Sequence, residues 1–178
     1  MLKIVKIPDP ILNKKTALVK TIDAATEKLV EQMIAACRSV NGIGLAAPQV
    51  GKSIRLCVIN LEHMGMPPFP LINPRIVKKS SKQVDMEEGC LSIPNVFGIV
   101  KRPEKITIEA QNLDGEKHRF EASGMLSRVI QHEVDHLDGI LFTSKMIKST
   151  MGAPVSTRPV SPSGRQGGSS RGGPDEKM

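Results

Sequence analysis

Aromatic side chains are almost absent from this sequence. Its 178 residues include no Trp, no Tyr and only four Phe, so few rings are available on which nucleic-acid bases could stack. The formal net charge is +7, but residues 148–178 alone carry five Lys/Arg against two Asp/Glu, and the rest has no block of like charge. We therefore expect no DNA partner. A mildly basic surface favours a polyanionic neighbour such as the ribosome, and we expect a transient contact with it.

Long apolar runs are missing as well. No stretch approaches the roughly 20 apolar residues that cross a membrane, and the first ten residues resemble neither a signal peptide nor a transit peptide. The three cysteines are an odd number without framework spacing, so we expect no structural disulfides. Cys37 and Cys57 lie in apolar patterns and are expected in the core. These features predict a cytoplasmic protein that does not contact membranes.

Composition divides the chain into two parts at residue 147. In residues 148–178, 16 of 31 positions are Gly, Pro or Ser and large hydrophobic residues nearly vanish. Such a segment cannot bury enough apolar surface to offset its ordering entropy, so we expect a disordered tail. Residues 1–147 are long enough for one domain with a hydrophobic core.

The domain reads as a mixture of helices and strands. After an irregular arm over residues 1–20, Asp23 or Thr21 can cap a helix that runs to about Val40. The expected strands are residues 54–60, 71–77 (interrupted by Pro74), 97–101, and a hairpin of 105–110 with 117–122. Residues 64–70 read as a Pro/Gly loop. Ser123 can cap a second helix that ends at Gly139.

The second helix carries the pattern H-E-x-x-H. His132 and His136 are four residues apart and share one helix face, so both can reach one metal ion. Glu133, about 100° further round the helix, can contact a water on that metal without being a ligand. A third ligand is still needed, and Cys90 is a good candidate because Gly89 lets the backbone turn and present its thiolate.

These residues belong to three segments, 42–49, 88–92 and 131–136, that resemble the motifs of the peptide deformylase family in order and spacing. The resemblance runs from about Lys3 to Met146. It implies an α+β domain, with antiparallel sheets packed around the motif helix. The implied activity is removal of the formyl group from the N-terminal methionine of newly synthesised proteins, with N-formylmethionyl nascent peptides as the substrates.

The resemblance also implies a role for each matched residue. Cys90, His132 and His136 hold one divalent metal, natively Fe²⁺, although softness and geometry alone would also allow Zn²⁺, Ni²⁺ or Co²⁺. Glu133 acts as general base and acid. The Gln49 amide and the Leu91 N–H donate to the oxygen of the tetrahedral intermediate. The substrate-binding residues are the backbone of Ile43, Gly44 and Leu45, which pairs with the substrate as an added strand, together with Gly89 and Val129.

The following expectations come from the residues alone, without the resemblance. Val129 and the aliphatic part of Arg128 are hypothetical walls of a methionine pocket, and Arg102 is expected to form an ion pair with Glu88 or Asp135 that braces the ligands. His63 and His118 lack ligand spacing and read as surface residues.

Two other functions fit parts of the pattern. Zinc peptidases share the H-E-x-x-H helix but usually take a third ligand from a downstream Glu or His, and no His follows His136. A non-catalytic metal-binding or ribosome-associated module would have no need of Glu133.

Overall fold

A computed structural model describes residues 2–150. Within this range, the α-helices are α1 (Ala24–Ser39) and α2 (Gly124–Leu137), and short 3₁₀ helices are η1 (Pro10–Asn13), η2 (Ala47–Val50), η3 (Glu62–Met64) and η4 (Phe142–Ser144). The strands are β1 (Gly44–Ala46), β2 (Leu56–Leu61), β3 (Met66–Lys79), β4 (Gln83–Cys90), β5 (Ile93–Pro103), β6 (Lys105–Gln111), β7 (Lys117–Ser123) and β8 (Met146–Ser149). No helix in residues 2–150 is long and apolar enough to cross a bilayer.

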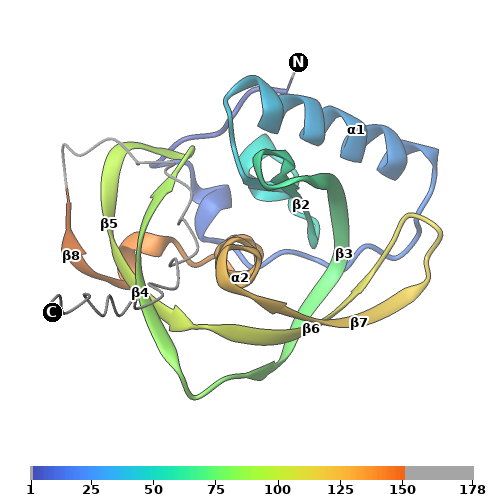
Figure 1. Ribbon diagram of the computed structural model, residues 1–178. Helices are drawn as coiled ribbons and strands as arrows, with labels where there is room; N and C mark the ends of the chain where they lie inside the picture. The colour runs from blue at the N-terminus through green and yellow to red at the C-terminus, as the bar shows by residue number, and fades with distance from the viewer. Residues whose placement is uncertain (1, 151–178) are drawn as a thin grey trace, which may run out of the picture.

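The strands form two antiparallel sheets, one of five strands in the order β1-β2-β3-β6-β7 and one of three in the order β4-β5-β8. Helix α2 lies in the middle of the molecule between the sheets, whereas α1 covers the outside of β2 (Figure 1). The expected α+β fold, with antiparallel sheets around the motif helix, is confirmed.

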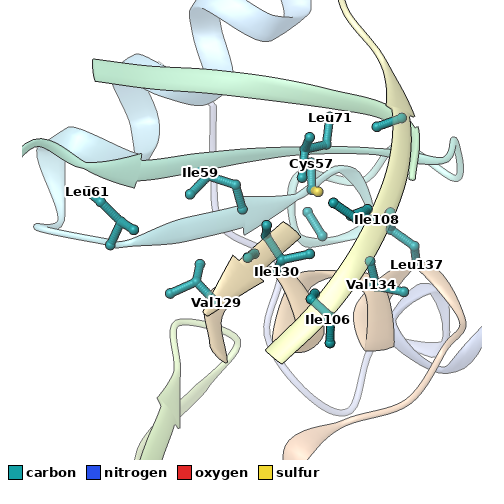
Figure 2. Close-up of a cluster of buried hydrophobic side chains, with 13 residues drawn as sticks. Cys57, Ile59, Leu61, Leu71, Ile106, Ile108, Val129, Ile130, Val134 and Leu137 are labelled. Atoms are coloured by element: carbon teal, nitrogen blue, oxygen red, sulfur yellow. The ribbon is translucent and has the colours of Figure 1, made fainter. Parts of the chain in front are cut away.

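The main hydrophobic core explains why α2 is central. Figure 2 shows Val129, Ile130 and Val134 of α2 facing Ile59 of β2 and Ile108 of β6. These side chains are almost entirely buried, and each buried aliphatic side chain contributes about 1.5–3 kcal/mol. Helix α2 is therefore held in place by packing against the apolar face of the five-stranded sheet, and its histidines project from a fixed position.

A second core cluster holds α1 against the other face of β2. Val30, Met33 and Cys37 of α1 pack with Leu56 and Val58. The helix begins where predicted, because the Asp23 side chain accepts a hydrogen bond from Thr26 N at 2.9 Å. At α2 the N-cap is Ser123, as expected, but its side chain makes no capping hydrogen bond. Cys37 and Cys57 are both buried free cysteines.

The clearest difference from the sequence-based expectation is strand β3. Residues 64–70 were expected to form a loop and Pro74 to interrupt a short strand, yet one strand runs from Met66 to Lys79. Residues 66–71 of β3 pair with β2 only. The edge of β3 that faces away from β2 has no strand partner there, so it needs no N–H donors and tolerates proline. Pro74 lies at a register shift between Ile72 and Arg75 in the pairing with β6. Strand β5 is likewise longer than expected.

The N-terminal arm ties together the segments that carry the site. Val5 N donates to Gln49 O at 2.8 Å, and Ile7 N donates to Ser92 O at 3.0 Å. At the other end of the domain, β8 pairs with β5 as far as Ser149, two residues beyond the boundary expected from composition. The rest of the expected tail, from residue 151 onward, lies outside the described residues.

Candidate active site and metal centre

Three side chains with metal-binding atoms converge between α2 and the end of β4. Candidate ligand atoms of Cys90, His132 and His136 all lie within 4.8 Å of one another, and Cys90 Sγ is 3.2 Å from His136 Nε2. His132 and His136 come from one face of α2, whereas Cys90 follows a register shift at Gly89 that ends the regular pairing of β4 with β5. One thiolate and two imidazoles suit a tetrahedral divalent metal with one open position, so the donor set fits the metal that the resemblance implies.

Glu88 fixes the orientation of the His132 ring, one of the three candidate ligands. Its Oε2 lies 2.9 Å from His132 Nδ1, which leaves Nε2 of the same ring to face the other ligand atoms. A carboxylate behind a ligating histidine sets the tautomer and increases the basicity of the ring. The ordering of His132 therefore depends on a residue 44 positions away in the sequence.

Two buried arginines hold Glu88 in turn. Arg102 forms a bidentate pair with it at 2.6 and 2.9 Å, and Arg128 Nη1 donates to Glu88 Oε1 at 2.8 Å. Burial raises the pKa of the Glu88 carboxyl, but hydrogen bonds from Arg102 and His132 outweigh it and hold the pKa well below its ordinary value. Glu88 is thus an ionised carboxylate throughout the neutral range.

Arg102 also bonds to α2. Its Nη1 donates to Asp135 Oδ2 at 2.7 Å, and Asp135 also pairs with Lys145 Nζ at 2.7 Å. The expected ion pair of Arg102 with Glu88 or Asp135 is present, and it involves both carboxylates. Arg102 therefore bridges the strand that leads to Cys90 and the helix that carries both histidines.

Glu133 carries a buried carboxyl that lies against Gly44 of β1. Its residue is 4% exposed, and Oε2 has no hydrogen-bond partner among the described residues. Burial raises the pKa of Glu133 to about 7. A carboxyl group with this pKa can both accept and release a proton near neutral pH, which the strongly ionised Glu88 cannot do.

Gln49 presents its amide N–H₂ toward Cys90. Its Oε1 accepts a hydrogen bond from Ala46 N at 2.8 Å, and because a backbone N–H can only donate, this bond sets the orientation of the amide. Nε2 then lies 3.2 Å from Ser92 Oγ and 3.5 Å from Cys90 Sγ. Leu91 directly follows Cys90, in the turn between β4 and β5.

Strand β1 leaves one edge of the five-stranded sheet free beside these groups. Ile43 O accepts a hydrogen bond from Asn60 N of β2 at 2.9 Å. In an antiparallel ladder the polar groups of successive residues point to opposite sides, so the N–H and C=O of Gly44 face the free edge. A Cβ at Gly44 would collide with Glu133 Oε1 and lie 2.8 Å from Val129 Cγ1. The glycine thus allows the backbone to lie directly against the carboxylate.

The remaining predicted residues are placed as follows. Gly89 stacks under the Phe97 ring, since a Cβ there would lie 2.6 Å from Phe97 Cε1. Val129 is 2% exposed and lies beside Gly44 and Glu133. His63 and His118 are exposed, as expected.

Two contributions were not anticipated from the sequence. The Arg128 guanidinium donates to Val84 O and Val100 O as well as to Glu88, so it braces β4 and β5. The Ser92 hydroxyl is the hydrogen-bond partner of Gln49. An arginine inside an apolar helix face is a sequence signal that could have indicated the role of Arg128. No local pattern indicates the role of Ser92.

The α+β fold and the Cys/His/His triad with its adjacent carboxylate define a metal-dependent hydrolase. A polypeptide deformylase family model matches residues 1–151. The peptide deformylase of Dictyoglomus thermophilum is 46% identical over 146 residues, covering 82% of this chain and 93% of that protein.

Solved structures agree with these sequence matches. The Thermotoga maritima peptide deformylase has a TM-score of 0.79 at 38% identity and covers 82% of this chain and 97% of its own. A Met-Ala-Ser-bound peptide deformylase from Acinetobacter baumannii has a TM-score of 0.77 at 34% identity, covering 82% and 98%. The chain belongs to the polypeptide deformylase family. It is an enzyme that removes the formyl group from formylated nascent peptides, and the peptidase and binding-module alternatives are set aside.

Proposed function

We propose that Glu133 is the proton-transfer group of the deformylation reaction and that Cys90, His132 and His136 hold its metal. The observation that carries this proposal is the buried Glu133 carboxyl, whose Oε2 has no hydrogen-bond partner among the described residues, directly after His132 in the helix that brings two of the three converging side chains together. Burying such a group without a partner destabilises the fold, and buried groups with perturbed pKa values concentrate at functional sites. When bound, a divalent metal supplies a Lewis acid that lowers the pKa of a water.

The protein groups divide the proton and charge transfers between them. Glu133 accepts the proton of the attacking water and later delivers it to the departing amine, so that formate and a free N-terminal methionine result. Gln49 Nε2 and the Leu91 N–H donate to the oxygen of the tetrahedral intermediate, where negative charge develops. Gln49 is suited to this role because the bond from Ala46 N keeps its amide aimed at the site.

The substrate backbone is proposed to add to the free edge of β1. Within the segment of Ile43, Gly44 and Leu45, Gly44 would supply the main-chain hydrogen bonds, because its N–H and C=O face the free edge, while Ile43 and Leu45 hold it against β2. Gly89 would lie close by and Val129 against the methionine side chain. Strand addition takes affinity from main-chain bonds and specificity from side-chain pockets. The direct contact of Gly44 with Glu133 would then bring the bound peptide within reach of the proton-transfer group.

Fe²⁺ is our proposal for the native ion, as the family resemblance implies. The thiolate and two imidazoles also suit Zn²⁺, Ni²⁺ and Co²⁺. We further propose that the enzyme works in the cytoplasm, where formylated nascent chains are made.

The central test is formate release from formyl-Met-Ala-Ser by protein purified without oxygen, with the metal measured on the same sample. We expect one metal per chain, mainly iron, and rapid release. Glu133→Gln should lower kcat by about 10²- to 10⁴-fold with its metal retained. Unchanged release by a metal-loaded Glu133→Gln variant would overturn the assignment of the proton-transfer group.

A transient contact with the ribosome is supported by a basic groove away from the metal centre. The groove encloses about 880 Å³. Its charged lining comprises five basic residues, Lys15, Arg55, Arg75, Lys117 and Arg119, against Glu109 and Asp138. The net charge of this lining is +3, which suits a phosphate backbone. Residues 148–178 are themselves basic, so charge argues against them as the occupant.

Co-sedimentation with ribosomes at several salt concentrations tests this contact. Lys117→Glu combined with Arg119→Glu should weaken binding by about tenfold or more and reduce its salt dependence. Lys78→Glu with Lys79→Glu is the matched control, since it makes the same charge change on exposed positions outside the groove. Equal losses in both variants would indicate a non-specific charge effect. Hydrolysis of free formyl-Met-Ala-Ser should not change in either variant.

A further inference from the structure

Asn60 is the polar exception in a strand that is otherwise apolar and buried. Strand β2 reads Leu-Cys-Val-Ile-Asn-Leu and is buried throughout. Figure 2 shows Ile59 and Leu61 on the face turned toward α2. Strand alternation therefore places Asn60, which lies between them, on the opposite face with Val58 and α1. Asn60 is 8% exposed, so a polar side chain has been placed where an apolar one would fit.

Both amide groups of Asn60 bond to the segment that leads into β1. Its backbone N–H donates to Ile43 O, and its side-chain Nδ2 donates to Gly42 O, each at 2.9 Å. On the other side, Gly42 N donates to Cys37 O at the end of α1, also at 2.9 Å. Two consecutive peptide carbonyls are thus held by a single residue, which sets the direction in which the chain enters β1.

The oxygen of the same amide has no partner. Asn60 Oδ1 is buried and accepts no hydrogen bond from any described residue. An unpaired buried carbonyl opposes folding, and an apolar residue of the same size would avoid it. Compared with leucine, the asparagine adds the bond to Gly42 O and a side-chain interaction with the buried Cys37 thiol.

We propose that Asn60 is a positioning residue for substrate binding: by holding Gly42 and Ile43 from behind, it orients the free edge of Gly44 toward the peptide and against Glu133. This inference rests on the proposed docking of the substrate along β1. Asn60 itself lies on the far side of that strand and touches neither the metal ligands nor the proton-transfer group. It acts by limiting the backbone orientations at the docking edge, which lowers the entropy lost when the peptide binds.

The test compares Asn60→Ala with Asn73→Ala for two substrates, formyl-Met-Ala-Ser and formyl-Met. Asn73 is the control because its Nδ2 also donates to a carbonyl of an irregular segment, Val19 O at 3.0 Å, and its side chain bonds no residue of the site. Its φ is 53°, so alanine at this position also strains the backbone. Both variants are expected to melt at a lower temperature, so stability alone does not distinguish them. Metal content is measured for each.

We expect Asn60→Ala to raise KM for formyl-Met-Ala-Ser by about tenfold, as a lost substrate-binding interaction does, with kcat changed less than about threefold. The increase should be much smaller for formyl-Met, which has no following residues to pair with the strand. Asn73→Ala should leave both KM values within about twofold.

Each other outcome is informative. If wild-type protein favours the tripeptide over formyl-Met and Asn60→Ala keeps that preference in full, the role of Asn60 is refuted while docking on β1 stands. If the wild-type protein itself shows no preference for the tripeptide, docking on β1 fails and the inference fails with it. If Asn60→Ala loses its metal and its kcat together, Asn60 supports the metal centre and the proposal is also wrong.

Discussion

Gly44→Ala is the smallest change that tests the arrangement of the active site. Adding one methyl group at this position would bring Cβ into collision with Glu133 Oε1, and to 2.8 Å from Val129 Cγ1 and 2.9 Å from Glu133 Cδ. The φ of Gly44 is not in the left-handed region, so alanine introduces no backbone strain there. The expected effect is therefore purely steric and is directed at Glu133, the proposed proton-transfer group.

The size of the effect follows from what can move. Val129 is packed in the main core, so the collision is relieved by displacement of the Glu133 carboxylate or of the β1 edge, by about 1 Å. Overpacking of this kind destabilises the fold by about 1–3 kcal/mol. A misplacement of about 1 Å at a catalytic group reduces the rate by about 10²-fold. We therefore expect kcat/KM to fall by two orders of magnitude while the metal stays bound.

Formate release and metal content measured on Gly44→Ala provide the assay, with Gly65→Ala as control. Gly65 has φ +78° and no atom within 4 Å of a built Cβ. Its substitution therefore strains the backbone without touching the site, and its kcat/KM should stay close to the wild-type value. If metal-loaded Gly44→Ala kept kcat/KM within about threefold of wild type, the position of Glu133 against β1 would not matter for the rate, and the expected effect of a displacement of about 1 Å would be refuted.

Further predictions concern charge and pH. Glu88→Gln should destabilise the fold by about 3–5 kcal/mol in urea unfolding, because it leaves two buried guanidinium groups with one carboxylate fewer, whereas Glu109→Gln, at a more exposed ion pair, should change stability by less than about 1 kcal/mol. The pKa of Glu88 is lowered in the folded state from its ordinary 4.5, so the stability that Glu88 contributes is present above pH 4.5 and is lost as the pH falls further. Glu88→Gln should remove this loss of stability in acid. If the stability of Glu88→Gln fell with acidification as steeply as that of the wild type, the reasoning would be contradicted. Activity should fall as Glu133, with a pKa raised by burial to about 7, becomes protonated at lower pH, and a bound cation would move this limb to lower pH. An activity that rises on acidification would exclude Glu133 as the base.

Several features were predictable because they depend on near neighbours in the sequence. The i, i+4 spacing of His132 and His136 is enough to place both rings on one helix face, and the capping Asp23 and the hairpin of β6 with β7 follow from local patterns. Strand β3 was misread for the complementary reason. Proline is a local signal for a loop, but the pairing of β3 with β2 and β6 decides its conformation.

The sequence by itself therefore determined the α+β class, the helix that carries His132 and His136 and, through the resemblance of three motifs, the family and its reaction. Only the tertiary structure decided how those residues are held. The contacts of Glu88 with His132, of Gly44 with Glu133 and of Asn60 with Gly42 join residues 44, 89 and 18 positions apart. Such contacts have no periodicity along the chain, because they arise where separate elements pack against one another in space.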